Sequence, residues 1–115
     1  MSIKKESLDK LEREYQFEFP EDIKELLLSL ACGSINDLHF LHTDMIYPYD
    51  EENGAMNGYV AIATDILGNY FAFNPNSDNP NQIYYYSHDP LGYGVCAKNV
   101  TKLLEAFVNS NFDIL

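Results

Sequence analysis

The stretch FPEDIKELLLSLACG, residues 19–33, predicts the helix from which the rest of the fold can be worked out. Pro20 supplies the backbone angle of a first helical position, and Glu21 and Asp22 are favourable at the positive end of a helix dipole. The glycine that ends the stretch is typical of a left-handed cap, so the helix is expected over about residues 20 to 32. The side chains that repeat at helical spacing and predict its buried face are Ile23, Leu26, Leu27 and Leu30.

Amphipathic helices are also predicted near both ends of the chain. Leu8, Leu11 and Tyr15 lie at i, i+3 and i+7 of a helix over about residues 3 to 15, with charged side chains on its opposite side. A C-terminal helix is expected to pack on a sheet through residues that again repeat at helical spacing, namely Val100, Leu103, Leu104, Phe107 and Val108.

The segments between these helices lose the helical period. Residues 35–47 predict one or two short strands, and residues 50–58 predict an acidic loop. Residues 74–81 are rich in asparagine and proline and predict a second loop, after which residues 82–87 predict a strand. A stretch with proline and glycine then leads to the C-terminal helix.

A β-hairpin is predicted in the centre of the chain. Residues 59–63 and 70–73 are rich in aromatic and aliphatic side chains and predict its two strands, and residues 65–69 predict the turn between them. Gly68 is expected to take a positive φ that a residue with a Cβ would avoid.

These elements predict the α+β class. Two N-terminal helices, a central, mainly antiparallel sheet of about four to six strands and a C-terminal helix packed on the sheet would account for the chain. No repeat or linker divides the sequence, so residues 1–115 are predicted to form a single domain.

The charge of the chain indicates what kind of partner it attracts. Eighteen acidic and seven basic residues give a formal net charge of −11. Nucleic acid is a poor partner, because binding to phosphate requires clustered basic residues and the adjacent pair here is Lys4 and Lys5 at the N-terminus. A basic protein, by contrast, would be attracted and steered.

No membrane association is expected either. Charged residues near the N-terminus interrupt any secretory apolar run, and no stretch approaches the roughly 20 apolar residues of a membrane helix. A cytoplasmic location is therefore predicted, in which Cys32 and Cys96 are expected to stay reduced.

Four stretches of the sequence form a pattern that spans nearly the whole chain. They are the helix opened by Phe19–Asp22 and closed by Cys32 and Gly33, the turn Asp65–Asn69 running into Tyr70–Phe73, the strand Ile83–Tyr86 with Ser87, His88 and Asp89, and the helix with Leu103, Leu104 and Phe107. This pattern resembles the SUKH superfamily, whose members include fungal cell-wall regulators and bacterial immunity proteins encoded beside polymorphic or contact-dependent toxins. The sequence departs from the family where Tyr86 stands in a position at which members often have tryptophan, and the chain is short for the group.

This resemblance implies an immunity protein that binds a cognate toxin, commonly a nuclease, and occludes its active site with an acidic surface. The alternative that it leaves open is a regulatory interaction module without a toxin partner. A third class, a small hydrolase or metal-dependent enzyme, lacks visible residues for catalysis, so no enzyme activity and no cofactor are expected. A monomer is favoured, although a tyrosine-rich edge strand would also allow a homodimer.

Candidate metal-binding and catalytic residues are explained more simply by structural roles. His39 and His42 are three residues apart, which in a strand places them on opposite faces, so no metal site is predicted. His88 and Asp89 are expected to cap the end of a strand, since sequence neighbours rarely face each other. The acidic run that begins at Asp50 lacks the ligand spacing of a helix-loop-helix calcium site.

The candidate binding residues combine aromatic rings with carboxylates. Residues 47–52 place two tyrosines before three acidic residues, a composition that suits an interface; a solvated loop with one tyrosine in the core is the alternative. Residues 84–86 are tyrosines that alternate across a strand, so one sheet face would present tyrosine for recognition, for packing under a helix or for a dimer partner. The predicted contact residues are Asp44, Tyr47, Tyr49, Asp50, Glu51, Glu52, Tyr84 and Asp89.

Overall fold

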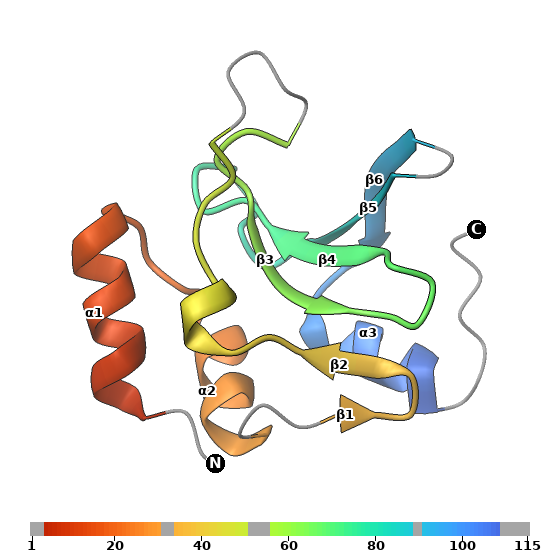
Figure 1. The fold of residues 1–115 in the computed structure, drawn as a ribbon, viewed down its shortest axis with the longest axis horizontal. Coiled ribbons are helices and arrows are strands. Elements are labelled where there is room, and N and C mark those ends of the chain that lie inside the picture. The colour runs from red at the N-terminus through yellow and green to blue at the C-terminus, as the bar shows by residue number, and fades with distance from the viewer. Residues whose placement is uncertain (1–3, 31–33, 51–55, 89–90, 109–115) are drawn as a thin grey trace.

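The protein folds as an antiparallel sheet with helices packed on one of its faces (Figure 1). The structure is a computed structural model that describes residues 4–30, 34–50, 56–88 and 91–108. Within these ranges the chain forms three α-helices, one 3-10 helix and six strands, which confirms the predicted α+β class. The elements are α1 (Lys5–Tyr15), α2 (Glu21–Leu30), β1 (Ser34–Ile35), β2 (Leu38–Phe40), η1 (Thr43–Met45), β3 (Val60–Thr64), β4 (Tyr70–Phe73), β5 (Ile83–His88), β6 (Leu91–Ala97) and α3 (Val100–Val108).

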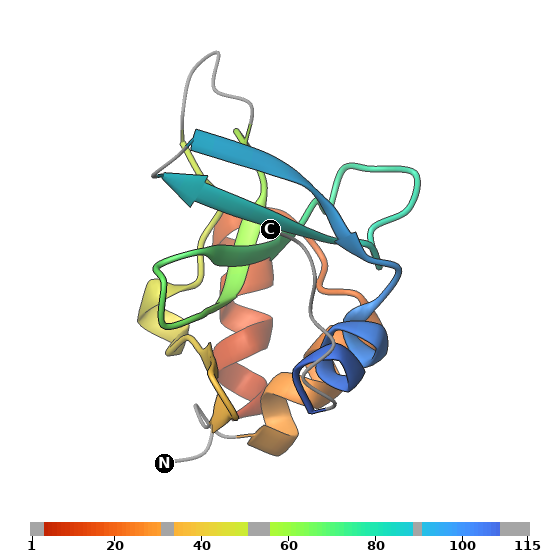
Figure 2. The same ribbon diagram turned by 90° about the vertical axis from the view of Figure 1, so that its right-hand side faces the viewer.

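Each strand pairs with the next one along the chain, so the sheet order is β1-β2-β3-β4-β5-β6 and every pair is antiparallel. This arrangement is a meander, and its longest connection, residues 41–59 between β2 and β3, contains η1. Figure 2 shows the hairpin of β5 and β6, with α3 following β6. The chain therefore enters and leaves the sheet through helices, as the sequence predicts.

Helix α1 ends where Gln16 takes a left-handed conformation with φ 57°, and its N–H bonds to the carbonyl of Glu12. Leu8 is fully buried, but Tyr15 is 42 % exposed, so the predicted burial of Tyr15 is wrong. The physical reason is the position of the helix end: the chain turns at Gln16, and the next buried ring is Phe17.

Helix α2 begins one residue later than predicted. The carbonyl of Pro20 accepts the N–H of Lys24 at 2.9 Å, so Pro20 caps the helix instead of occupying its first turn. Ile23 and Leu27 are buried and Leu26 is partly buried, as the periodicity predicts. The predicted cap at Gly33 lies outside the described residues.

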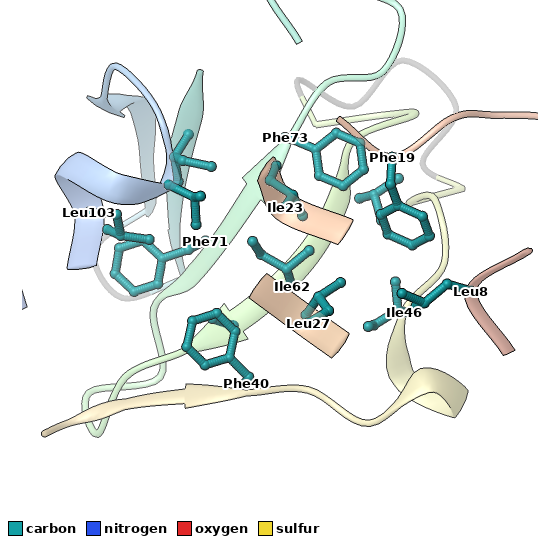
Figure 3. Packing of buried hydrophobic residues seen from close by; sticks show 14 of the residues in the cluster. Leu8, Phe19, Ile23, Leu27, Phe40, Ile46, Ile62, Phe71, Phe73 and Leu103 are labelled. Carbon is teal, nitrogen blue, oxygen red and sulfur yellow. The ribbon is translucent and has the colours of Figure 1, made fainter. Parts of the chain in front are cut away.

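The main hydrophobic core lies between the helices and one face of the sheet (Figure 3). Phenylalanine rings dominate it: the ring centroids of Phe17 and Phe19 are 4.9 Å apart, and Phe19 lies 5.7 Å from Phe73. Phe71 meets Phe107 of α3 edge-on at 5.7 Å. The fully buried residues of this core include Leu8, Ile23, Leu38, Ile46, Val60, Ile62, Ile83 and Leu103.

A β-bulge in β3 gives the core an additional side chain. Ala61 pairs with Ala72, but the next pairing is that of Ala63 with Phe71, so Ile62 is the extra residue. The bulge allows two consecutive residues, Ile62 and Ala63, to pack against the main core, which strict alternation would forbid.

The predicted central hairpin is confirmed by β3, β4 and the turn between them. Asp65 organises this turn, because its carboxylate accepts the N–H groups of Leu67 at 3.0 Å and Asn69 at 2.9 Å. The same carboxylate also accepts the side-chain amide of Asn69, which is buried. Gly68 has a φ of +83°, the positive value that the sequence predicts.

Strand β6 was not predicted, because its glycines break the alternating pattern. Gly92 and Gly94 pair with Ser87 and Tyr85 of β5. A Cβ at Gly94 would lie 3.5 Å from the ring of Tyr85, and one at Gly92 would lie 3.9 Å from it. The Tyr85 ring therefore covers the backbone at the two glycines, and this cross-strand packing compensates for their missing side chains.

Helix α3 confirms the predicted C-terminal helix except at its last residue. Val100 and Leu103 are buried, and Leu104 and Phe107 pack partly against the core. Val108 is 59 % exposed, so its predicted burial is wrong. Val108 is the last residue of the helix. The carbonyl of its neighbour Phe107 accepts a hydrogen bond from Asn36 Nδ2 at 2.6 Å, which ties the end of α3 to the turn between β1 and β2.

Candidate partner-binding face

The sheet face that points away from the helices is lined by tyrosine. Successive side chains of a strand point to opposite faces, so the neighbours of the buried Phe71 point away from the main core. Cross-strand pairing places Tyr70 opposite Tyr86 there. We call this surface the tyrosine face; it consists of Leu41, Tyr49, Met56, Tyr59, Ala61, Tyr70, Ala72, Tyr84 and Tyr86.

The rings of the tyrosine face pack against one another. Tyr59 meets Tyr84 edge-on, with 5.0 Å between the ring centroids, and Tyr49 lies 6.1 Å from Tyr86. The Tyr84 hydroxyl donates a hydrogen bond to Gln82 Oε1 at 3.2 Å. Rings held by such contacts lose little conformational entropy when a partner binds.

The pairing of β5 with β6 extends this face toward the edge of the sheet. Val95 lies opposite Tyr84, and Tyr93 lies opposite Tyr86. Val95 is 53 % exposed and Tyr93 is 55 % exposed. The face therefore changes from half-buried rings at its centre to exposed apolar side chains along β6.

Met56 lies in the turn that ends the loop predicted over residues 50–58, of which residues 51–55 lie outside the described residues. Its side chain is buried in the cluster of the tyrosine face. Hydrogen bonds close the loop beside it, since the N–H of Tyr49 donates to the carbonyl of Tyr59 and the N–H of Gly58 donates to that of Tyr49, each at 2.9 Å. The buried Met56 side chain thus fixes the turn over residues 56–58 against the rings of the tyrosine face.

A partly enclosed pocket opens on the tyrosine face, with a volume of about 160 Å³. Ala61 of β3 contributes the smallest lining side chain, and Met45 and Tyr47 form a wall from η1 and the segment after it. The side chains that line the pocket are Leu41, Met45, Tyr47, Tyr49, Ala61, Tyr70 and Tyr86.

The structure brings some of the predicted contact residues together and separates others. Tyr47 and Tyr49 both line the pocket, whereas Tyr84 lies on the same face outside it. Asp44 is exposed and lies in a neighbouring hollow of about 300 Å³ between α1 and η1. Asp50 is exposed directly after Tyr49. The predicted contact residues that lie outside the described residues are Glu51, Glu52 and Asp89.

Sequence reasoning missed the remaining lining residues, because they come from separate parts of the chain: Leu41 and Met45 precede β3, and Ala61, Tyr70 and Tyr86 belong to β3, β4 and β5. The alternation of residues 84–86 does place Tyr86 on the same side as Tyr84. The pairing of Tyr70 with Tyr86 and the position of Ala61 depend on the register between strands and on the bulge in β3. Local sequence patterns do not determine either of these.

The two central histidines lie apart from the pocket. His39 belongs to β2 and His42 precedes η1; both side chains are exposed. Across residues 4–30, 34–50, 56–88 and 91–108, no three His, Cys, Asp or Glu side chains are grouped so that they could hold a metal ion. The predicted capping role of His88 with Asp89 falls partly outside the described residues.

The sequence matches the model of a known protein family over most of its length. The sequence model of the SMI1 / KNR4 family (SUKH-1) matches residues 2–106. The chain belongs to the SUKH-1 family. This confirms the resemblance carried by the four sequence stretches, and the family includes toxin immunity proteins. No curated protein and no solved structure matches this SUKH-1 chain.

The helices of this SUKH-1 chain are short. Among the described residues, no helix has both the length and the apolar character that a span requires.

Cys96 of this SUKH-1 chain is free and packs against the main core. Burial raises the pKa of its thiol to about 12, and a backbone hydrogen bond opposes this shift only in part. The nucleophilic thiolate is therefore scarce at neutral pH, which makes a redox or catalytic role for Cys96 unfavourable.

We expect Cys96 to react slowly with thiol reagents in the folded protein. In a Cys32→Ser variant, the aromatic disulfide dithiobis(nitrobenzoic acid) should modify Cys96 at pH 8 about 100-fold more slowly than it modifies glutathione. The reaction should become fast in urea, where the thiol regains an ordinary pKa. Fast modification without denaturant would contradict the burial seen for this side chain.

Proposed function

We propose that this SUKH-1 protein is an immunity protein that acts by binding a basic toxin domain, with a nuclease as the favoured class, and not by catalysis. The observation that carries the proposal is the tyrosine face, where aromatic rings surround a pocket in a strongly acidic protein. Tyrosine is enriched among the residues that dominate interface energies. Family membership supports the same reading, since SUKH-1 includes toxin immunity proteins.

Electrostatics supports a basic partner. The net charge of −11 produces an attractive field for a positively charged protein, and a nuclease must be basic where it holds phosphate. Asp44 and Asp50 are exposed and adjoin the pocket residues Met45 and Tyr49 in sequence. In the proposed complex these carboxylates steer the partner and the rings supply the buried contact.

The first experiment is co-expression with the C-terminal domain encoded by the gene immediately upstream, with cell survival and co-purification as readouts. Survival together with a one-to-one complex supports the proposal. If the toxin is active and the protein neither protects nor co-purifies, the immunity function is refuted and the regulatory interaction module becomes the better account.

A charge-reversal pair tests the position of the interface. The double variant Asp44→Lys with Asp50→Lys is expected to slow association with the toxin domain about tenfold at low salt, because both residues are exposed and follow or precede pocket residues in the chain. The matched control is Glu6→Lys with Glu25→Lys, which changes the net charge equally on exposed positions of α1 and α2. Association rates can be measured by stopped flow. If both pairs slow association equally, the net charge of the whole protein steers the partner, and the tyrosine face is removed from the proposal.

A further inference from the structure

The pocket of the tyrosine face has the size of one side-chain end group. Its volume is about 160 Å³, and an apolar cavity of roughly 150 Å³ accommodates a benzene molecule. A folded partner could therefore insert a single side chain there, while the surrounding rings contact the rest of its surface. The question is which side chain the lining favours.

The lining is aromatic and contains no basic residue among the described side chains. Four tyrosines, a methionine, a leucine and an alanine form it. The π face of a tyrosine ring attracts a cation, and sulfur and aliphatic groups contact the apolar stem of a long side chain.

Charge selects a basic side chain over an apolar one. Asp44 and Asp50 are exposed next to pocket residues in the chain, and the protein carries a large negative charge. Of the two long basic side chains, arginine has a planar guanidinium that stacks on aromatic rings and is less strongly hydrated than an ammonium group. Moving the guanidinium of arginine from water into a pocket lined by rings is therefore more favourable than moving the ammonium group of lysine there.

We propose that the pocket bounded by Tyr47, Tyr49, Tyr70 and Tyr86 is the receptor for one arginine side chain of the protein partner. This inference deepens the proposed function and rests on it for the identity of the partner. The arginine inserts its guanidinium between the rings, and the exposed carboxylates of η1 and of the segment after Tyr49 orient the basic surface around it.

The test uses the isolated protein and a minimal probe, N-acetylarginine methylamide, in a titration followed by ¹⁵N–¹H correlation spectra. We expect saturable shifts at millimolar concentration, centred on the backbone amides of Leu41, Tyr47, Ala61 and Tyr70. The neutral citrulline analogue, which has a similar shape, should bind about 3- to 10-fold more weakly, because the attraction between the cation and the rings is lost. The leucine analogue should be no better than citrulline.

Two variants and a control locate the binding. Ala61→Leu fills the pocket from β3 and should abolish the shifts; because Ala61 is buried, its fold is checked by circular dichroism. Tyr47→Ala removes a ring that is 43 % exposed, and it should weaken binding several-fold without affecting the fold. The control Tyr93→Ala changes an exposed ring on the same face that does not line the pocket, and it should leave binding unchanged.

The outcomes separate this inference from the proposed function. Equal shifts with citrulline or leucine would overturn the choice of arginine, and shifts scattered over the acidic surface without saturation would overturn the pocket. If the toxin is neutralised but the probe does not bind, the arginine receptor is refuted and the immunity function stands. If the probe binds and the toxin is not neutralised, the receptor stands and the immunity function is refuted.

Discussion

A Phe71→Ala variant is expected to lose about 3–5 kcal/mol of unfolding free energy. Phe71 is fully buried in the centre of the sheet, and its ring meets that of Phe107 edge-on at 5.7 Å. The substitution removes apolar contact with α3 and leaves a cavity between the sheet and the helix. Because domains of this size have only about 5–15 kcal/mol of stability, the variant should be close to unfolding at 37 °C.

Urea unfolding followed by far-ultraviolet circular dichroism would measure this loss. Phe71→Leu retains most of the apolar volume and should lose less than half as much. The exposed control is Ile66→Ala in the turn between β3 and β4, where the side chain is 68 % exposed. Its expected effect is within about 0.5 kcal/mol. A Phe71→Ala variant as stable as this control would show that α3 does not close the core over β4.

A Glu12→Ala variant is expected to lose about 1–3 kcal/mol, because one carboxylate joins three parts of the N-terminal region. Glu12 Oε2 accepts the backbone N–H of Phe19 at 2.9 Å, and Oε1 accepts Lys24 Nζ at 2.8 Å. Lys24 also donates to Asp9 at 2.7 Å. These hydrogen bonds raise the pKa of Lys24, first through Asp9 and then through Glu12, and the bond from Lys24 lowers the pKa of Asp9.

The alanine variant leaves the N–H of Phe19 without its acceptor beside a buried ring. Glu12→Gln keeps a neutral acceptor for that N–H, so it should retain about half of the stability that alanine removes. Glu14→Ala is the matched control, since Glu14 is an exposed acid in the same helix. The same urea titration measures all three variants. If Glu12→Ala and Glu14→Ala are equally stable, the carboxylate does not hold α2 against α1.

The elements that the sequence predicts well are those whose information is local. Helix α2 follows from Pro20, the acids after it and the leucine repeat, and the central hairpin follows from Gly68 and its flanking strands. The predicted bounds of these elements differ from those in the structure by only one or two residues. In each case a short run of residues contains the pattern that predicts the element.

The elements that the sequence does not predict depend on contacts between distant residues. Strand β6 contains two glycines, which are unfavourable in a strand until the ring of Tyr85 packs over them. Met56 lies in a polar segment but is buried by rings that come from other strands. Tyr15 fits a helical repeat, yet the helix ends at that residue and leaves the ring exposed.

The candidate site was predicted in part for the same reason. Tyr47 and Tyr49 are adjacent to acidic residues in sequence, so a pattern of rings and carboxylates indicates them. Tyr70, Tyr86 and Ala61 join them only after the strands have paired in a particular register, with a bulge that shifts one residue of β3. Composition can thus indicate the type of contact, whereas the shape of the pocket requires the tertiary structure.

The two faces of the sheet place different constraints on how this protein can diverge. Along β4 and β5, a residue packed under the helices alternates with one on the tyrosine face. Substitutions at consecutive positions therefore reduce the unfolding free energy by different amounts. Changes under the helices create cavities or overpacking, while changes at the half-exposed rings cost less stability. Substitutions at the half-exposed rings can therefore change the chemistry of the tyrosine face at a lower cost in stability than substitutions one position away, under the helices.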